Sequence, residues 1–194
     1  MHHTRSLRRL ALSGASVVVL AASLAAQPQQ VRIRVTNLAP VNGTALTPVW
    51  LGIHDGSFNL FTPGMAASTA LERIAEDGNV MPLATAFGAA GFGTQGVAGS
   101  GPLLAGQTAE FTFMLDRANP LHRFLSYASM LLPSNDAFIG TMNPRGRALT
   151  DANGNFQSFS FTVGGNQVWD AGTEVNDEAE NSTAFFGQTM PNTG

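Results

Sequence analysis

Residues 30–38 read QVRIRVTNL, and the alternation within this stretch decides the class of fold. Its odd positions from 31 to 35 are Val, Ile and Val, whereas its even positions from 32 to 36 are Arg, Arg and Thr. Successive side chains of a strand point to opposite faces, so a period of two predicts a strand with one buried and one solvated face.

Short segments of the same kind recur along the chain, separated by turns rich in Gly, Pro and Asn. In the segment at 156–163, the alternation predicts that Phe159, Phe161 and Val163 face inward. Many short strands with such turns are typical of an antiparallel β-sandwich or barrel, an all-β fold. Strands are expected at 30–38, 46–54, 108–115, 123–132, 137–141, 156–163 and 166–169.

Only residues 69–77 carry a helical pattern. Thr69 and Glu72 have the spacing of a capping box, and Gly78 can end the helix. Residues 87–106 are rich in Gly and Ala, and they contain a literal match to the GxGxxG motif of dinucleotide-binding proteins. Because no strand precedes that match and no amphipathic helix follows it, we interpret this stretch as a flexible surface loop.

Residues 1–26 have the features of an export signal. Three arginines lie at 5, 8 and 9, the apolar run at 10–24 follows, and small residues at 23 and 25 suit cleavage. The apolar run is short for a membrane span, so we favour secretion over a retained anchor. The paired arginines leave twin-arginine export as an alternative. Residues 27–194 are then one domain, secreted, periplasmic or at the cell surface.

The composition of the domain limits its partners. Without the signal, seven arginines and no lysine face thirteen acidic residues, which gives a net charge of −6 with His neutral. This charge disfavours nucleic acid as an electrostatic partner. A membrane surface, bridged by calcium, is a further alternative that the charge does not support. The absence of Cys excludes disulfides, thiolate metal sites and cysteine nucleophiles.

The acidic run near the C-terminus predicts a metal site. Five carboxylates fall within residues 170–180, although only 12% of the chain is charged. Crowded carboxylates repel one another, so they are either solvated or neutralised by a cation. Asp170 and Glu174 can converge across Ala-Gly-Thr, and Asp136, at a turn, is the best remote candidate. Oxygen ligands of this kind suit Ca²⁺. A solvated acidic loop remains the alternative.

Nothing in the sequence marks a catalytic centre, and no catalytic residue is predicted. The domain has two histidines, His54 and His122, for which a packed or solvated role is favoured. Paired carboxylates of the acidic tail could still hydrolyse a glycan or an ester. An exported hydrolase is therefore the alternative function.

Four blocks, at residues 46–58, 71–79, 129–140 and 169–174, resemble the bacterial form of the spondin N-terminal domain, and their order covers nearly the whole domain. The resemblance implies a β-sandwich similar to the calcium-dependent membrane-binding sandwiches. It places the calcium ligands of the family on Asp136, Asp170 and Glu174. Ala137 stands where the animal motif has an aromatic residue, and Glu174 where Asp is common. Bacterial members usually continue past the acidic tail, which suggests a chain truncated before a closing strand.

From the residues and the resemblance together, we expect an exported, non-enzymatic, calcium-binding module for adhesion or matrix binding. A Ca²⁺ ion would tie the rim loops of the sandwich, and the partner would be an extracellular protein or glycan whose identity the sequence does not give.

Overall fold

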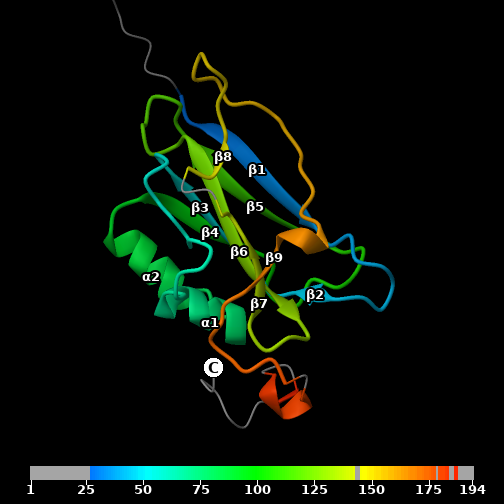
Figure 1. The fold of residues 1–194 in the computed structure, drawn as a ribbon. Helices are drawn as coiled ribbons and strands as arrows, with labels where there is room; N and C mark the ends of the chain where they lie inside the picture. Colours follow the sequence, from blue (N-terminus) through cyan, green and yellow to red (C-terminus); the bar gives the residue numbers. More distant parts are fainter. Residues whose placement is uncertain (1–26, 143–144, 178, 184–185, 188–194) are drawn as a thin grey trace, which may run out of the picture.

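The computed structural model describes residues 27–142, 145–177, 179–183 and 186–187, and the expected signal at 1–26 lies outside them. The described chain is mostly β, with antiparallel pairing throughout and two short α-helices (Figure 1). Its elements are β1 (Gln29–Thr36), β2 (Ala45–Leu46), β3 (Val49–His54), α1 (Thr69–Asp77), α2 (Met81–Ala89), β4 (Gly93–Ala98), β5 (Thr108–Leu115), β6 (Phe124–Leu132), β7 (Ala137–Gly140), β8 (Arg147–Ala148), η1 (Gly165–Gln167), β9 (Val168–Asp170) and η2 (Glu180–Ser182).

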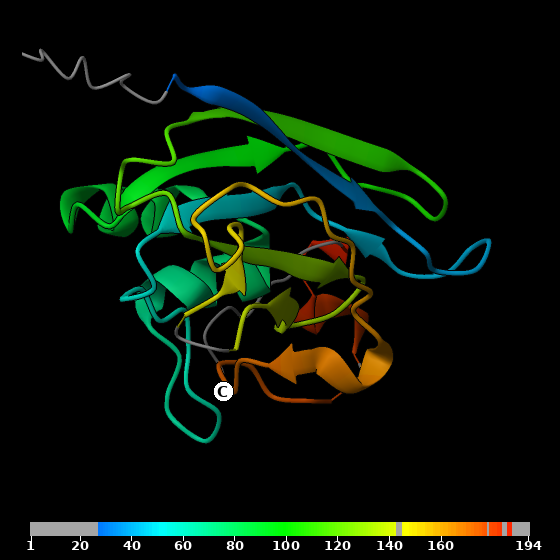
Figure 2. The ribbon, with the colours of Figure 1, turned by 90° about the horizontal axis from the view of Figure 1, so that it is seen from above.

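The strands form two sheets, as the predicted sandwich requires. The smaller sheet pairs β1 with β5, and the larger sheet runs in the order β4-β3-β6-β7-β9, with β2 and β8 paired to β6. In Figure 2, β1 and β5 run together at one edge of the molecule, away from β9. The predicted alternation of β1 is confirmed, because its valine and isoleucine positions are half-buried while both arginines are exposed.

The core lies on both faces of β3, which is buried along its whole length. On one face, Val49, Leu51 and Ile53 pack against the β1–β5 sheet. On the other face, Trp50 packs against the two helices, with its ring 5.2 Å from that of Phe87 in α2. The domain therefore has a layer of helices in addition to its two sheets.

Helix α1 has the predicted bounds, and Gly78 ends it in the left-handed conformation with a φ of 65°. The cap differs from the prediction, since Ser68 rather than Thr69 accepts the hydrogen bond from the amide of Leu71. Helix α2 was not predicted. It is apolar almost all round, so its sequence has no amphipathic period, and it is held by burial of Leu83 and Phe87.

The prediction of a loop at 87–106 is wrong, because this stretch contains the end of α2 and all of β4. Gln95 explains part of the difference. Its side chain accepts a hydrogen bond from Trp50 Nε1 at 2.8 Å and donates one to the carbonyl of Ala84 at 2.7 Å. Gly96 lets the ring of Phe111 lie against the strand, since a Cβ there would come within 2.3 Å of that ring. Glycine thus serves close packing here, not flexibility.

The prediction of a strand at 156–163 is also wrong. Within the described residues, this segment has one isolated bridge, between Thr150 and Phe156, and no ladder. Phe159 and Phe161 do not face inward as predicted but are 43% and 40% exposed. Their rings lie 6.2 Å apart, and the Arg147 guanidinium lies 4.3 Å from the centre of the Phe161 ring. The alternating pattern is therefore not enough to form a strand, because this segment has no neighbouring strand to which its backbone can bond.

His54 is a structural core residue, as the sequence favoured. Its imidazole is fully buried, Nδ1 accepts a hydrogen bond from the amide of Gly56 at 2.9 Å, and Nε2 lies 2.9 Å from Ser126 Oγ. Because Nδ1 is an acceptor, Nε2 carries the proton and donates to the serine. Burial lowers the pKa of His54 from 6.5 to about 4, against the smaller opposing effect of Asp55.

We predict that Gly96→Ala destabilises the domain by about 1–3 kcal/mol, because the added methyl group overlaps the Phe111 ring. Gly101→Ala is the matched control, since a Cβ at that position meets nothing within 4 Å. Urea unfolding of both variants measures the difference. Equal stabilities would contradict close packing between β4 and β5.

We also predict that stability falls as the pH drops from 6.5 towards 4. In this window the unfolded chain binds a proton at His54 that the folded chain excludes, so the free energy of unfolding rises with pH. The full difference is about 3 kcal/mol. Urea unfolding as a function of pH measures it, and a His54→Gln variant should have a flatter profile. If the pH dependence of stability is the same in the His54→Gln variant, His54 is not its cause.

Candidate metal centre

The turn between β6 and β7 places Asp136 directly before β7. Ser134 shapes this turn, because its hydroxyl donates to the carbonyl of Leu131 at 2.7 Å and accepts from the amide of Ala137 at 3.1 Å. The Asp136 side chain is fully buried. The first predicted ligand is therefore an interior carboxylate rather than a solvated turn residue.

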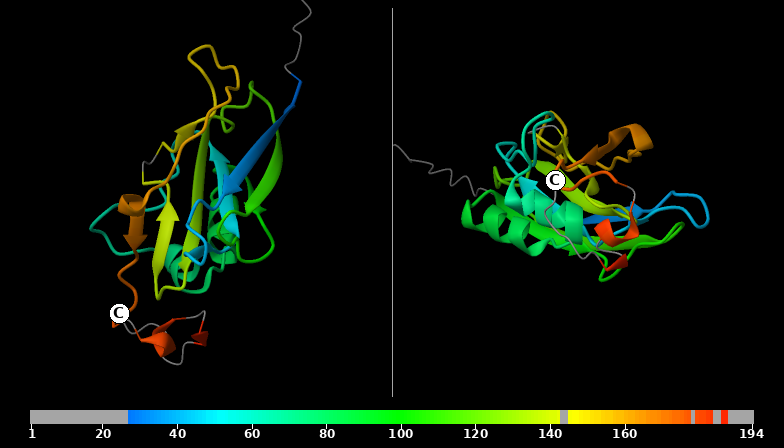
Figure 3. Two further views of the ribbon diagram at one scale, coloured as in Figure 1. Left: turned by 90° about the vertical axis from the view of Figure 1, so that its right-hand side faces the viewer. Right: turned by 60° about the horizontal axis from the view of Figure 1, so that its bottom comes forward.

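Asp136 binds the loop that follows β9. Its Oδ2 accepts hydrogen bonds from the amides of Thr173 at 2.8 Å and Glu174 at 3.2 Å, and its carbonyl accepts from the amide of Ala171 at 3.2 Å. The pairing of Ala137 with Asp170 continues this contact into the sheet. Figure 3 shows the β6–β7 turn and the segment after β9 at the same end of the sheet.

Asp170 lies at the outer side of the same loop and is exposed. Its Oδ1 accepts from the amide of Gly172 at 2.7 Å, and its Oδ2 accepts from the side-chain amide of Asn176 at 2.6 Å. Asn135 donates to the Asn176 side chain at 2.9 Å, which links the loop to the β6–β7 turn. Gly172 has a φ of 68°, which allows the chain to fold back as the sequence suggested.

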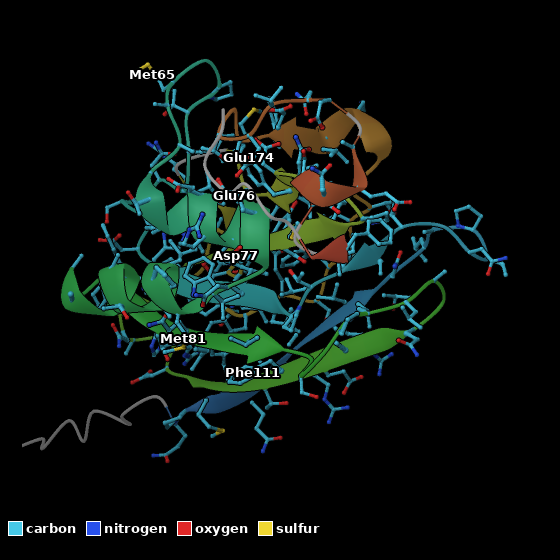
Figure 4. The ribbon with its side chains drawn as sticks, turned by 90° about the horizontal axis from the view of Figure 1, so that it is seen from below. Met65, Glu76, Asp77, Met81, Phe111 and Glu174 are labelled. Atoms are coloured by element: carbon cyan, nitrogen blue, oxygen red, sulfur yellow. The ribbon has the colours of Figure 1, made fainter. Side chains whose placement is uncertain are left out.

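Glu174 points towards helix α1 and is only 4% exposed. Figure 4 shows it beside Glu76 of that helix. The structure thus brings the three predicted residues to one end of the sandwich, with Asp136 and Glu174 inside and Asp170 outside.

Glu76 is a further carboxylate at this end that the sequence analysis missed. It is fully buried, and Arg73 bonds to its Oε2. Burial is the largest influence on its pKa, which is raised, although a hydrogen bond with Thr173 and the charge of Arg73 act in the opposite direction. Its proximity to the buried residues Ile74 and Ala75 was the one signal that could have indicated an inward position.

Burial also raises the pKa of Asp136, and the charge of Asp170 adds to this effect. The hydrogen bonds from Thr173 and Glu174 oppose it by favouring the charged form. Two interior carboxylates, Asp136 and Glu76, thus lie in surroundings that disfavour their charge. A positive ion beside them would reverse that effect.

Two carboxylate oxygens among the described residues are buried without a hydrogen-bond partner, namely Asp136 Oδ1 and Glu76 Oε1. Such atoms are rare in native proteins and need a water molecule or an ion. Both belong to this end of the molecule, and both carboxylates interact with Thr173. A donor set made of carboxylate oxygens fits a hard cation such as Ca²⁺.

The carboxylates are not arranged as a finished coordination shell. In the part of the chain that the structure describes, no three side chains of His, Asp or Glu form a group that could hold a metal ion as they stand. The hydrogen bonds to Asp136 Oδ2 occupy one side of that carboxylate and leave Oδ1 for an ion.

A pocket of about 440 Å³ adjoins the β6–β7 turn and the segment that follows the 170–174 loop. The two linked amides of Asn135 and Asn176 line one side of it, and Asp177, Glu180 and Phe186 contribute further. Because Asn176 also donates a hydrogen bond to Asp170, the wall of the pocket is tied to the acidic loop at residues 170–174.

The chain matches the model of a known protein family. The described residues contain no helix that is long and apolar enough to cross a membrane. No curated protein matches the chain. The family model for the spondin N-terminal domain, Spondin_N, matches residues 38–189, a range that includes β2 to β9 and both carboxylate-bearing loops. The chain therefore belongs to the spondin N-terminal domain family, whose members are extracellular modules of the adhesion type.

Proposed function

We propose that this domain is an exported, calcium-binding adhesion or matrix-binding module without enzymatic activity. One observation carries the proposal. The buried carboxylate of Asp136 bonds through one oxygen to the loop at 171–174, while its other oxygen has no partner among the described residues. An ion at that oxygen would satisfy the atom and offset the burial of the charge.

In this mechanism Asp136, Asp170 and Glu174 hold the ion. Ca²⁺ supplies positive charge and binds six to eight oxygens, so carbonyl groups or water complete its shell. The chain itself contributes the turn, the fold-back at Gly172 and the amide link between Asn135 and Asn176. The ion would fix the β6–β7 turn against the 170–174 loop, and with them the wall of the neighbouring pocket. An extracellular protein or glycan is the partner that we propose for this rim.

The stability that a bound calcium ion would add can be estimated. With a Kd of about 10⁻⁴ M and about 1 mM calcium outside the cell, binding to the folded state alone adds about 1.4 kcal/mol of stability. For a domain of this size that corresponds to a rise in Tm of about 3–5 °C. Such a site is occupied outside the cell and serves to rigidify loops that the sheets do not hold.

The structure gives less support to the alternative, an exported hydrolase. A hydrolase that uses two carboxylates needs one that keeps a proton at neutral pH. Asp177 of the acidic tail is exposed, and a hydrogen bond from the amide of Ala179 lowers its pKa. His54 and Ser126, although hydrogen-bonded to each other, are both buried and out of reach of a substrate.

We predict that calcium raises the Tm of the domain lacking residues 1–26 and that Asp170→Ala abolishes this rise, because the ion loses one of its charged ligands. Glu110→Ala is the matched control. It also removes one exposed acid, but one that lies on β5 and pairs with Arg34. Thermal unfolding with and without calcium, together with calorimetric titration, gives the measurement. A calcium shift that persists undiminished in the Asp170 variant would refute the proposed ligand set.

A further inference from the structure

Helix α1 carries a carboxylate that the fold of the helix does not require. Glu76 lies in the last turn of α1, where its side chain is fully buried. Acidic side chains are seldom buried completely unless they are paired or bind a metal, and a negative charge near a helix C-terminus is unfavourable. The position of Glu76 therefore calls for a compensating interaction.

Arg73 supplies part of that compensation but not all of it. Its guanidinium bonds to Glu76 Oε2 and is shared with Glu72 and Asp77 on the same helix. One positive charge thus faces three carboxylates. Glu76 Oε1 has no partner among the described residues, so the arginine satisfies only one of its two oxygens.

The surroundings of Glu76 belong to the acidic loop. Thr173 donates its hydroxyl to Asp136 Oδ2 at 3.4 Å, and it also lies near enough to Glu76 to lower the pKa of that carboxyl, against the larger opposing effect of burial. Glu174 faces Glu76 from the same loop, as Figure 4 shows. The two unpartnered oxygens of this region thus belong to carboxylates that share one neighbour, Thr173. A cation at this place would meet Glu76 as well as the loop.

We propose that Glu76 is a further ligand of the ion held by Asp136, Asp170 and Glu174, and that it binds through Oε1. This inference rests on the proposed function. The ion then joins three parts of the chain, namely the β6–β7 turn, the 170–174 loop and helix α1. Glu76 and Asp136 are its interior ligands, and Asp170 closes the shell from the solvent side.

A purely structural role for Glu76 has a different consequence. If the carboxylate only tethered α1 through Arg73 and Thr173, a glutamine would keep the size of the side chain and its hydrogen bonds. Stability would then change by the same amount with and without calcium. If Glu76 is a ligand, in contrast, the glutamine variant lacks the negative charge that binds the ion. Its loss of stability then appears only when calcium is present.

The test is calorimetric calcium titration of the domain lacking residues 1–26 and of its Glu76→Gln and Asp77→Asn variants. Asp77 is the matched control, since it is adjacent on α1, bonds to Arg73 and has a side chain that is 37% exposed. We expect Glu76→Gln to weaken calcium binding about tenfold or more, and Asp77→Asn to change it less than about twofold. Unfolding in calcium-free buffer gives the baseline for each variant, because Glu76→Gln removes a buried charge and also weakens the ion pair with Arg73.

Hydrogen exchange of the unchanged protein supplies a second readout. Calcium should slow exchange of the α1 amides if Glu76 binds the ion, even if the glutamine variant fails to fold. Equal calcium affinity of the Glu76→Gln variant, or no calcium effect on α1, would overturn this inference while leaving the proposed function intact. Absence of calcium binding by the unchanged protein would overturn both.

Discussion

The arrangement at the acidic end of the molecule depends on one buried carboxylate. Asp136 accepts the amides of Thr173 and Glu174 and thereby fixes a loop more than thirty residues further along the chain. Without these bonds the loop would be held by the short pairing of β7 and β9, by the backbone bond from Ala171 to the Asp136 carbonyl and by the side chain of Asn135. This arrangement costs free energy of folding, because burial disfavours the charge that makes Asp136 a good acceptor. That conflict is the reason why we propose a positive ion at this end of the fold.

Most of the sheet could be predicted from the sequence, because two-residue alternation reports directly on a half-buried strand. The predicted strand at 108–115 has the bounds of β5, and the predicted helix has those of α1. The failures have a common cause, since they concern segments whose conformation is decided by distant neighbours. Helix α2 is apolar on nearly every side, and β4 owes its place to the contacts of Gln95 and Gly96 with other elements. The segment at 156–163 has the opposite defect, a strand pattern without a partner strand.

The residues of the candidate site can likewise be divided into those that the sequence indicated and one that it did not. Charge crowding and spacing pointed to Asp170 and Glu174, and the turn before β7 pointed to Asp136. All three lie at one end of the fold. Glu76 could not be found in this way, because it lies almost a hundred residues earlier and its role depends on how α1 packs. In a helix pattern it reads as an ordinary solvated acid, and only its burial distinguishes it from Asp77.

The unpaired segment at 156–163 affects the tendency of the protein to aggregate. Apart from the amide of Gln157, its backbone groups make no hydrogen bonds to the backbone of other described residues, and its sequence favours strand pairing. Such an edge is a template for aggregation when it is flat and apolar. Here the Arg147 guanidinium covers the ring of Phe161, and serines separate the phenylalanines. Charged side chains on an exposed edge oppose its pairing with a second copy, so we expect Arg147 to hinder the joining of neighbouring molecules into a continuous sheet.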